Sequence, residues 1–145
     1  MKKLLLSLSL AIGFGLGASA DTYKLVTDAS TLSAGDKILI VNVANKQAMS
    51  TEQKSNNRGV EAVQITDNAI EPGANVQVIT LEEASTANQW NLNVGDGYLY
   101  AASSSSNYLK TADLTSAGTN ANATISIDSN GNATIKFQGI ILEIY

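Results

Sequence analysis

Short stretches of apolar residues, or of apolar and polar residues in alternation, recur along the chain from residue 23 onwards. Residues 37–43 (Lys-Ile-Leu-Ile-Val-Asn-Val) are nearly all apolar, which predicts a central strand with both faces buried. Shorter runs predict further strands over residues 76–81, 90–94, 98–101, 108–111, 124–127 and 133–137. Turn-forming residues separate these runs at short intervals, so the pattern is typical of an all-β sandwich or barrel.

Two local structures can be specified further. Asn130-Gly131 stands between two alternating runs and readily takes the positive φ angles of a type I′ turn. We therefore expect a hairpin that pairs residues 125–128 with residues 132–137. One helical turn is expected over residues 28–34, because Asp28 can cap its start and Gly35 can end it. No other segment of the chain is expected to be helical.

A weak internal repeat refines the fold class. Residues 37–50 have the order strand, polar loop, short strand, and residues 97–111 repeat that order. Residues 133–137 can begin a third copy, although the chain ends before that copy is complete. Threefold repetition of such units builds a β-trefoil. We therefore favour a small antiparallel barrel of trefoil type, with a β-sandwich as the alternative.

Residues 1–20 have the three parts of a secretory signal peptide. Lys2 and Lys3 form a positive start, an uncharged apolar run follows, and Ala18 and Ala20 stand at the positions that signal peptidase reads. The run is shorter than the ~20 apolar residues of a membrane-spanning helix. A lipid anchor would need Cys at the cleavage site, and the chain has none. We expect cleavage near Ala20 and one domain over residues 21–145. The product would be soluble, periplasmic or secreted, and not inserted in a membrane.

The composition excludes several function classes. The sequence has no His and no Cys, so it offers no imidazole base, no thiol nucleophile and no zinc site built from those ligands. The formal net charge is −4, whereas nucleic-acid-binding proteins usually carry a basic patch. We therefore expect a protein that is not an enzyme, with no cofactor, no metal and no nucleic-acid partner.

Carboxylate chemistry is the remaining catalytic possibility. Glu82 and Glu83 are neighbours, and neighbours on a strand point to opposite faces, so they would not act on one substrate atom. Asp96 and Asp113 would meet only if the tertiary fold brought them together. A hydrolase that uses carboxylates alone is therefore the third-ranked hypothesis, and loss of turnover on changing Asp96 or Asp113 would support it.

Residues 128–132 (Asp-Ser-Asn-Gly-Asn) partly resemble a calcium-binding loop. In the EF-hand the glycine is the sixth loop residue and a glutamate is the twelfth, and this segment has neither in place. The hairpin accounts for the same residues more simply. Asn122 and Asn132 each begin an Asn-Ala-Thr glycosylation sequon, a motif common by chance.

Three tyrosines flank a serine-rich loop and form the candidate binding site. Tyr98 and Tyr100 share one face of their expected strand, and Tyr108 follows Asn107 after the loop at residues 103–106. If Leu99 faces the core, both strand tyrosines face outward, where aromatic rings with nearby Asn and Ser groups can bind a sugar. The alternative is that these tyrosines cover core edges and form local hydrogen bonds. Trp90 is expected in the core.

Several segments together resemble a small β-domain that recurs in secreted and surface proteins of Bacteroidetes. The matching residues are 23–28, 32–42, 48–51, 56–59, 97–103, 107–111 and 132–135. The resemblance spans essentially the whole expected mature chain. Members of that family occur alone, in tandem, or appended to enzymes such as secreted nucleases, and look like accessory or binding modules. The resemblance supplies no catalytic residues.

The C-terminus departs from that family. Its members continue with a polar turn and about two more strands, whereas this chain ends Gly-Ile-Ile-Leu-Glu-Ile-Tyr at residues 139–145. We hypothesise a frameshift that truncates the domain and leaves Ile140, Ile141 and Leu142 poorly buried beside an open sheet edge. An open shifted reading frame in the DNA would support this, and an early stop in that frame would refute it.

These observations favour a non-catalytic exported β-domain that acts as an accessory binding module for a glycan or a surface protein. The candidate ligand-binding residues are Tyr98, Tyr100, Asn107 and Tyr108. The alternative is a structural repeat or spacer module of surface proteins that binds no ligand.

Overall fold

The computed structural model describes residues 4–9, 21–103, 105–137 and 140–141, with side chains described for 21–103 and 105–137. The strands are β1 (Leu4–Ser9), β2 (Tyr23–Leu25), β3 (Lys37–Asn42), β4 (Gln47–Gln53), β5 (Arg58–Ala62), β6 (Ala69–Ile70), β7 (Ile79–Glu83), β8 (Trp90–Asn93), β9 (Tyr98–Ala101), β10 (Leu109–Ala112), β11 (Ala123–Ile127), β12 (Ala133–Phe137) and β13 (Ile140–Ile141). The helical elements are η1 (Ala29–Thr31), α1 (Leu114–Ala117) and η2 (Gly118–Ala121).

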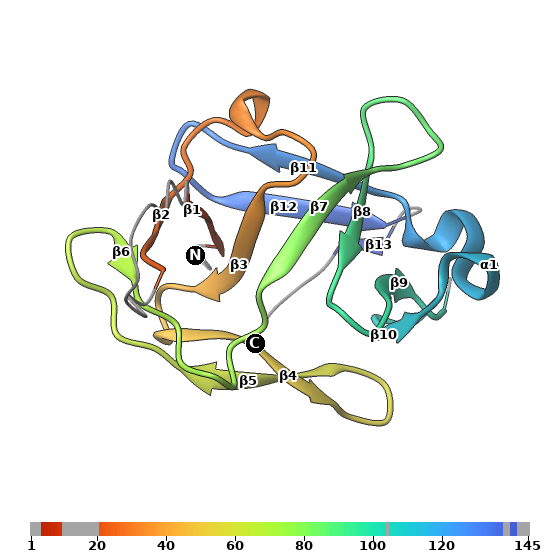
Figure 1. Cartoon of the computed structure of the whole chain (residues 1–145), viewed down its shortest axis with the longest axis horizontal. Coiled ribbons are helices and arrows are strands. Elements are labelled where there is room, and N and C mark those ends of the chain that lie inside the picture. The colour runs from red at the N-terminus through yellow and green to blue at the C-terminus, as the bar shows by residue number, and fades with distance from the viewer. Residues whose placement is uncertain (1–3, 10–20, 104, 138–139, 142–145) are drawn as a thin grey trace, which may run out of the picture.

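All pairings between these strands are antiparallel, and they join into one sheet (Figure 1). The main path runs β13-β12-β11-β8-β7-β3-β1-β2-β6. On the side of this path, β4 pairs with β3 and β5, and β9 pairs with β8 and β10. The all-β class is therefore confirmed. Among the described residues the path is open and does not close into the expected barrel.

Strand β3 separates two apolar clusters, as its nearly continuous apolar run predicts. Ile38 and Ile40 lie in the main core, whereas Leu39 and Val41 lie in a second cluster on the other face. All four are fully buried, at 0% exposure. The main core also takes buried residues from β7, β8, β9 and β12, and Trp90 packs at its margin. The second cluster adds Tyr23, Ala48, Ile70 and Val76.

The hairpin at residues 128–132 forms with a different turn from the expected one. Strand β11 pairs with β12 from Ala123↔Phe137 to Ile127↔Ala133, so the pairing prediction is confirmed. Gly131 has φ 79, but Asn130 is not among the positive-φ residues, so the turn is not type I′. The Gly131 amide donates to the Asp128 carbonyl at 3.0 Å, as in a type I turn that ends in a glycine bulge. Asp128 explains the preference, because its carboxylate accepts from the Asn130 and Asn132 amides.

A turn of the type I′ class occurs instead at Asp67-Asn68, before β6. Both residues have positive φ, 51 and 58. Thr66 and Ala69 exchange two backbone hydrogen bonds across the turn, at 3.0 and 2.9 Å. Asp and Asn are the side chains that tolerate this conformation best after glycine.

The expected helical turn near Asp28 is present but short. It is the 3₁₀ turn η1, and the Asp28 carboxylate accepts a hydrogen bond from the Ser30 amide at 2.9 Å. The expectation of no other helix is wrong, because α1 and η2 lie between β10 and β11. Asp113 caps α1 by accepting from the Ser116 amide at 2.8 Å, and Gly118 follows the helix with φ 57. Asp113 before the segment and Gly118 after it are sequence signals of a short helix. The strand patterns on either side of the segment led to a prediction without this helix.

Part of the expected signal peptide is a strand of the sheet. β1 pairs with β3 along its whole length and with β2 over two residues. The expected cleavage site near Ala20 lies outside the described residues, as does Leu142 at the C-terminus. No helix in the described ranges is long and apolar enough to cross a membrane.

Candidate binding face

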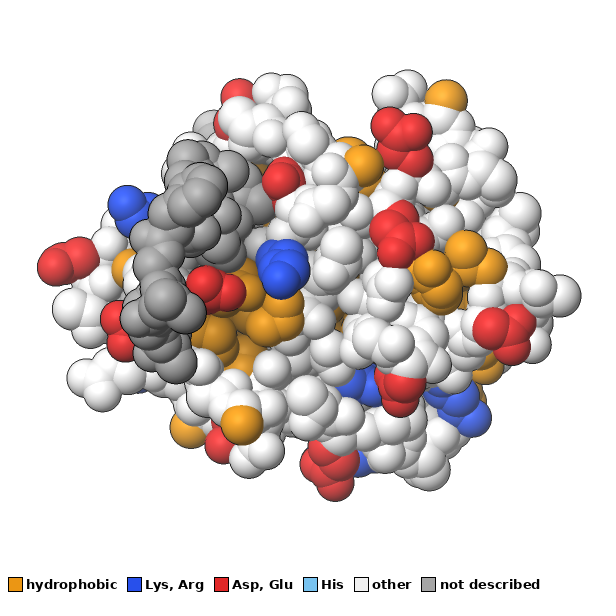
Figure 2. Space-filling view, in the orientation of Figure 1, with side chains coloured by type: hydrophobic (Ala, Val, Ile, Leu, Met, Phe, Trp, Pro, Cys, Tyr) orange, Lys and Arg blue, Asp and Glu red, His pale blue; other side chains and the backbone are white. Residues whose placement is uncertain are grey.

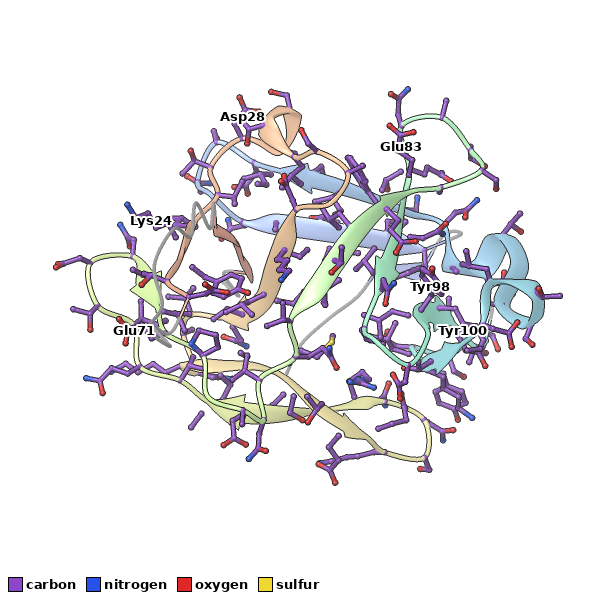
Figure 3. The ribbon with its side chains drawn as sticks, in the orientation of Figure 1. Lys24, Asp28, Glu71, Glu83, Tyr98 and Tyr100 are labelled. Atoms are coloured by element: carbon purple, nitrogen blue, oxygen red, sulfur yellow. The ribbon has the colours of Figure 1, made fainter. Side chains whose placement is uncertain are left out.

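The β9–β10 hairpin positions the predicted tyrosines. In β9, Leu99 and Ala101 are buried in the main core, whereas Tyr98 and Tyr100 are half-buried on the outer face. The alternation expected for this strand is therefore confirmed. Figure 3 shows Tyr98 and Tyr100 on the same end of the molecule, on the side away from β2 and β6.

Tyr108 extends the same face. Its backbone carbonyl accepts a hydrogen bond from the Ala102 amide at 2.9 Å. This bond extends the β9–β10 ladder to the residue immediately before β10. Lys110, two residues later, stands directly opposite Tyr100. Residues two apart on a strand share a face, so Tyr108 lies on the side of Lys110 and Tyr100. Its side chain is 37% exposed. We call Tyr98, Tyr100, Tyr108 and Lys110 the tyrosine face.

Asn107 lies at the edge of this face and is half-buried. Its backbone carbonyl oxygen is 2.7 Å from the side-chain nitrogen of Asn57, in the amide orientation that satisfies both of that group's neighbours. This hydrogen bond joins the turn between β4 and β5 to the segment before Tyr108. A second hydrogen bond joins the same parts of the chain, because the Leu109 amide donates to the Asn56 carbonyl at 3.0 Å.

Tyr98 also makes a local hydrogen bond, as the alternative interpretation expected. Its hydroxyl donates to Glu82 Oε2 at 2.8 Å, and Asn93 Nδ2 donates to Glu82 Oε1 at 2.7 Å. Three strands, β7, β8 and β9, contribute one side chain each to this cluster. The bond to the Glu82 carboxylate raises the pKa of the Tyr98 phenol, with burial as a smaller cause. The ring of Tyr98 is thus held in one orientation, while its hydroxyl is already occupied.

This contact predicts a measurable titration. The Tyr98 phenol holds its proton more tightly in the folded chain, so its pKa lies above the ordinary 10.0. The bond therefore stabilises the fold below the unfolded-state pKa and is lost as the pH rises through the higher folded-state value. The difference in phenolate absorbance between the wild type and Tyr98→Phe isolates this group. Glu82→Gln is expected to lower the Tyr98 midpoint, and an unchanged midpoint would contradict the assignment.

Arg58 fixes the hairpin to the rest of the molecule. Its guanidinium donates to Gln77 Oε1 at 2.7 Å, to the Ser50 carbonyl at 3.1 Å and to Thr111 Oγ1 at 3.2 Å. Gln77 is buried and donates in turn to the Val94 carbonyl at 3.1 Å. Burial lowers the pKa of Arg58, and the nearby Asp96 opposes that effect.

Gly97 permits the close approach of β10 to the turn before β9. A Cβ atom at this position would lie 2.9 Å from the backbone carbonyl oxygen of Ala112. Any larger residue would push β10 outward, and the side chains of the tyrosine face would move with it.

Asn122 belongs to a buried amide cluster and not to a surface sequon. It is 5% exposed, and its side-chain nitrogen donates to Thr86 Oγ1 at 3.1 Å. Its side-chain oxygen accepts from Asn91 Nδ2 at 3.0 Å, and Asn91 is also buried. The Asn122 side chain is therefore inaccessible for glycosylation in the folded chain.

Glu82 and Asp113, two of the acidic residues weighed for catalysis, have local partners, whereas Glu83 and Asp96 are exposed. Glu82 binds Tyr98, whereas Glu83 is exposed at the end of β7, and Figure 3 shows Glu83 well away from Tyr98. Asp113 caps α1. The Asp128 carboxylate accepts hydrogen bonds across the β11–β12 turn, and those from Asn132 are the main reason that the pKa of Asp128 is lowered.

Pattern reasoning missed Glu82, Asn93 and Arg58 as partners of this face. Asn93 stands opposite Tyr98 where β8 pairs with β9, and the register that brings these residues together depends on turn geometry. No local sequence signal indicates this contact, because it depends on the pairing of β7 with β8 and of β8 with β9. No family model matches this chain, and no curated protein or solved structure matches it.

Proposed function

We propose that this chain is an exported, non-catalytic accessory module that binds a glycan or a surface protein through the tyrosine face. The observation that carries the proposal is the placement of Tyr98, Tyr100 and Tyr108 on the outward side of a single hairpin. Tyrosine offers a large, rigid contact area with little loss of side-chain entropy on binding. Its ring can stack on the apolar face of a sugar, and neighbouring polar groups can form hydrogen bonds.

The polar surroundings suit recognition better than turnover. Glu82 and Asn93 hold Tyr98, and Arg58 reaches the same hairpin through Thr111. Lys110 places a cation opposite Tyr100, which allows contact with acidic sugars. Glu82, Asn93 and Tyr98 are hydrogen-bonded to one another, and the tyrosine rings provide the contact surface.

The proposal also retains a trefoil-like plan for the domain. Each of the three repeat positions expected from the pattern falls on an antiparallel pair of consecutive strands: β3–β4, β9–β10 and β12–β13. This supports descent from a repeated strand–loop–strand unit. An experimental structure with threefold pseudosymmetry would establish the trefoil, and two facing sheets would favour the sandwich.

A glycan array tests the proposed function. The exported protein should bind at least one class of polysaccharide, and Tyr100→Ala with Tyr108→Ala should weaken that binding at least about tenfold, as expected for aromatic anchors. Within the part of the chain that the structure describes, neither tyrosine hydroxyl makes a hydrogen bond. Val60→Ala is the matched control, because Val60 is also 37% exposed but lies on β5.

Three results would count against the glycan version. Binding to no polysaccharide would remove it, and so would a double variant that binds as the wild type does. Equal losses in the Val60→Ala control would show that the effect is not local. If neither glycans nor surface extracts are bound while sibling chains carry tandem copies, the spacer alternative replaces the proposal.

A further inference from the structure

The slot between β2 and β3 is built to hold an extended strand. β1 fills it, pairing antiparallel with β3 from Leu4↔Asn42 to Ser9↔Lys37. On its other side, β1 pairs with β2 at Ser7↔Leu25 and Leu8↔Lys24. The slot therefore presents strand edges on both sides and accepts a segment of the sequence Leu-Leu-Leu-Ser-Leu-Ser.

The walls of the slot are apolar on one face. Leu39 and Val41 of β3, with Tyr23 of β2, belong to the second cluster and are fully or almost fully buried. Figure 2 shows hydrophobic side chains gathered over the region that β3 occupies in Figure 1. An extended segment in this slot thus gains apolar contact as well as main-chain hydrogen bonds.

One end of the slot is positively charged. Lys24 stands opposite Leu8 and Lys37 stands opposite Ser9, so both cations lie near the C-terminal end of the occupying strand but on opposite faces of the sheet. Both lysines are exposed, although Asp36 and Asp28 lie nearby in the chain and reduce the local field. In a chain of net charge −4, Lys37 favours an occupant that carries a carboxylate at the position of Ser9, directly opposite it.

We propose that, once the leader is removed, this slot binds an extended apolar segment of a partner polypeptide by strand addition. The inference rests on the leader cleavage that the proposed function includes. Cleavage removes β1 and leaves the inner edges of β2 and β3 unpaired beside the second apolar cluster, a state that favours pairing with another strand. The partner segment runs antiparallel to β3, is about six residues long, and ends in an acidic residue opposite Lys37. Main-chain bonds supply the affinity, and Lys37 sets the orientation.

The test uses the full chain, expressed with its leader and recovered after export, with the new N-terminus read by intact mass. The probe is a fluorescent peptide with the sequence of residues 2–8 followed by Glu, which places the carboxylate at the Ser9 position opposite Lys37. One control peptide has Pro in place of the third Leu, and a second ends in Lys instead of Glu. Fluorescence anisotropy gives the affinities. Hydrogen exchange reports whether the β3 amides become protected.

The probe is expected to bind and to protect β3, and the Pro peptide is expected to bind at least about tenfold more weakly, since proline cannot donate to the ladder. The Lys peptide should bind more weakly at low salt. The exposed-site variant Lys37→Glu should reverse that preference, whereas Lys24→Glu, on the opposite face, should change it less. If the processed chain is unfolded alone, recovery of its β-sheet signal on adding the probe supports the inference equally.

Several results would overturn it. These are equal binding of the probe and Pro peptides, binding of neither, recovery of only uncleaved chain, or a dimer that the probe does not dissociate, which would make a second copy the occupant. The variant Tyr100→Ala with Tyr108→Ala should bind the probe normally. Loss of glycan binding there therefore leaves this inference intact, and loss of probe binding leaves the tyrosine face intact.

Discussion

Replacing Ile40 by Ala is expected to lower the free energy of unfolding by about 2–5 kcal/mol. Ile40 lies at 0% exposure in the main core, on the strand that separates the two apolar clusters. The truncated side chain leaves a cavity that the neighbouring strands, fixed by their ladders, can fill only in part. A domain of this size has only about 5–15 kcal/mol of stability in total. The substitution would therefore remove a large share of the total stability and leave the folded domain close to its unfolding threshold.

Leu39→Ala provides the internal comparison, since Leu39 is the adjacent residue on the opposite face of β3. It is equally buried but packs in the smaller second cluster, among several neighbours that are only partly buried. That cluster can collapse more easily around the lost atoms, so its loss should fall at the lower end of the same range. Urea unfolding measures both. Val60→Ala, at an exposed site, should stay within about 0.5 kcal/mol of the wild type. A loss below that level for Ile40→Ala would contradict the position of the core.

Replacing Arg58 by Ala is expected to lower the free energy of unfolding by about 2–3 kcal/mol. The substitution removes the donor to Gln77 Oε1, the Ser50 carbonyl and Thr111 Oγ1 at once. Gln77 is buried, so its oxygen would lose a charged partner without gaining free access to water. The β9–β10 hairpin would also lose a link to β4 and β5.

Arg58→Lys separates geometry from charge. Lysine keeps the positive charge but lacks the planar fork that reaches several acceptors, so it should recover less than half of the loss. Thr111→Val removes the weakest of the three contacts and should cost well under the Arg58→Ala effect. Denaturation curves for the three variants test the order. If Arg58→Ala and the wild type unfold together, Arg58 is a solvated surface residue and the hairpin is held by other contacts.

The strand pattern predicted the parts of the fold that depend on local periodicity. β3 is buried on both faces because its apolar run has no polar interruption until Asn42, and β12 has the predicted bounds of residues 133–137. The outward placement of Tyr98 and Tyr100 followed from the burial of Leu99 alone. In each case a period of two fixes which face a side chain takes.

Features that depend on long-range register or on competing side chains were not predictable in this way. The Asp128 carboxylate accepts hydrogen bonds from two backbone amides of its own turn. These bonds favour a turn other than the type I′ geometry that Asn130-Gly131 predicts. The contact between Glu82 and Tyr98 requires β7, β8 and β9 to be aligned first. Arg58 meets Thr111 across a long stretch of sequence, and no local pattern encodes that meeting.

The expected signal peptide, residues 1–20, is a further case in which a local pattern does not predict a long-range pairing. Its charge, length and small-residue end predict a signal peptide from sequence. Its pairing between β2 and β3 depends on an open slot formed by residues that follow it in the chain. The sequence pattern therefore predicts an export signal, and only the fold indicates the surface that removal of this segment would uncover.

The most direct test of the central claim is the glycan-array comparison of the wild type with the Tyr100→Ala, Tyr108→Ala double variant. Both proteins should first be shown to unfold at the same urea concentration. The account predicts binding to at least one polysaccharide by the wild type and a loss of at least about tenfold in the double variant. Equal binding by the two proteins, or no binding by the wild type, would contradict the assignment of a glycan-binding role to the tyrosine face.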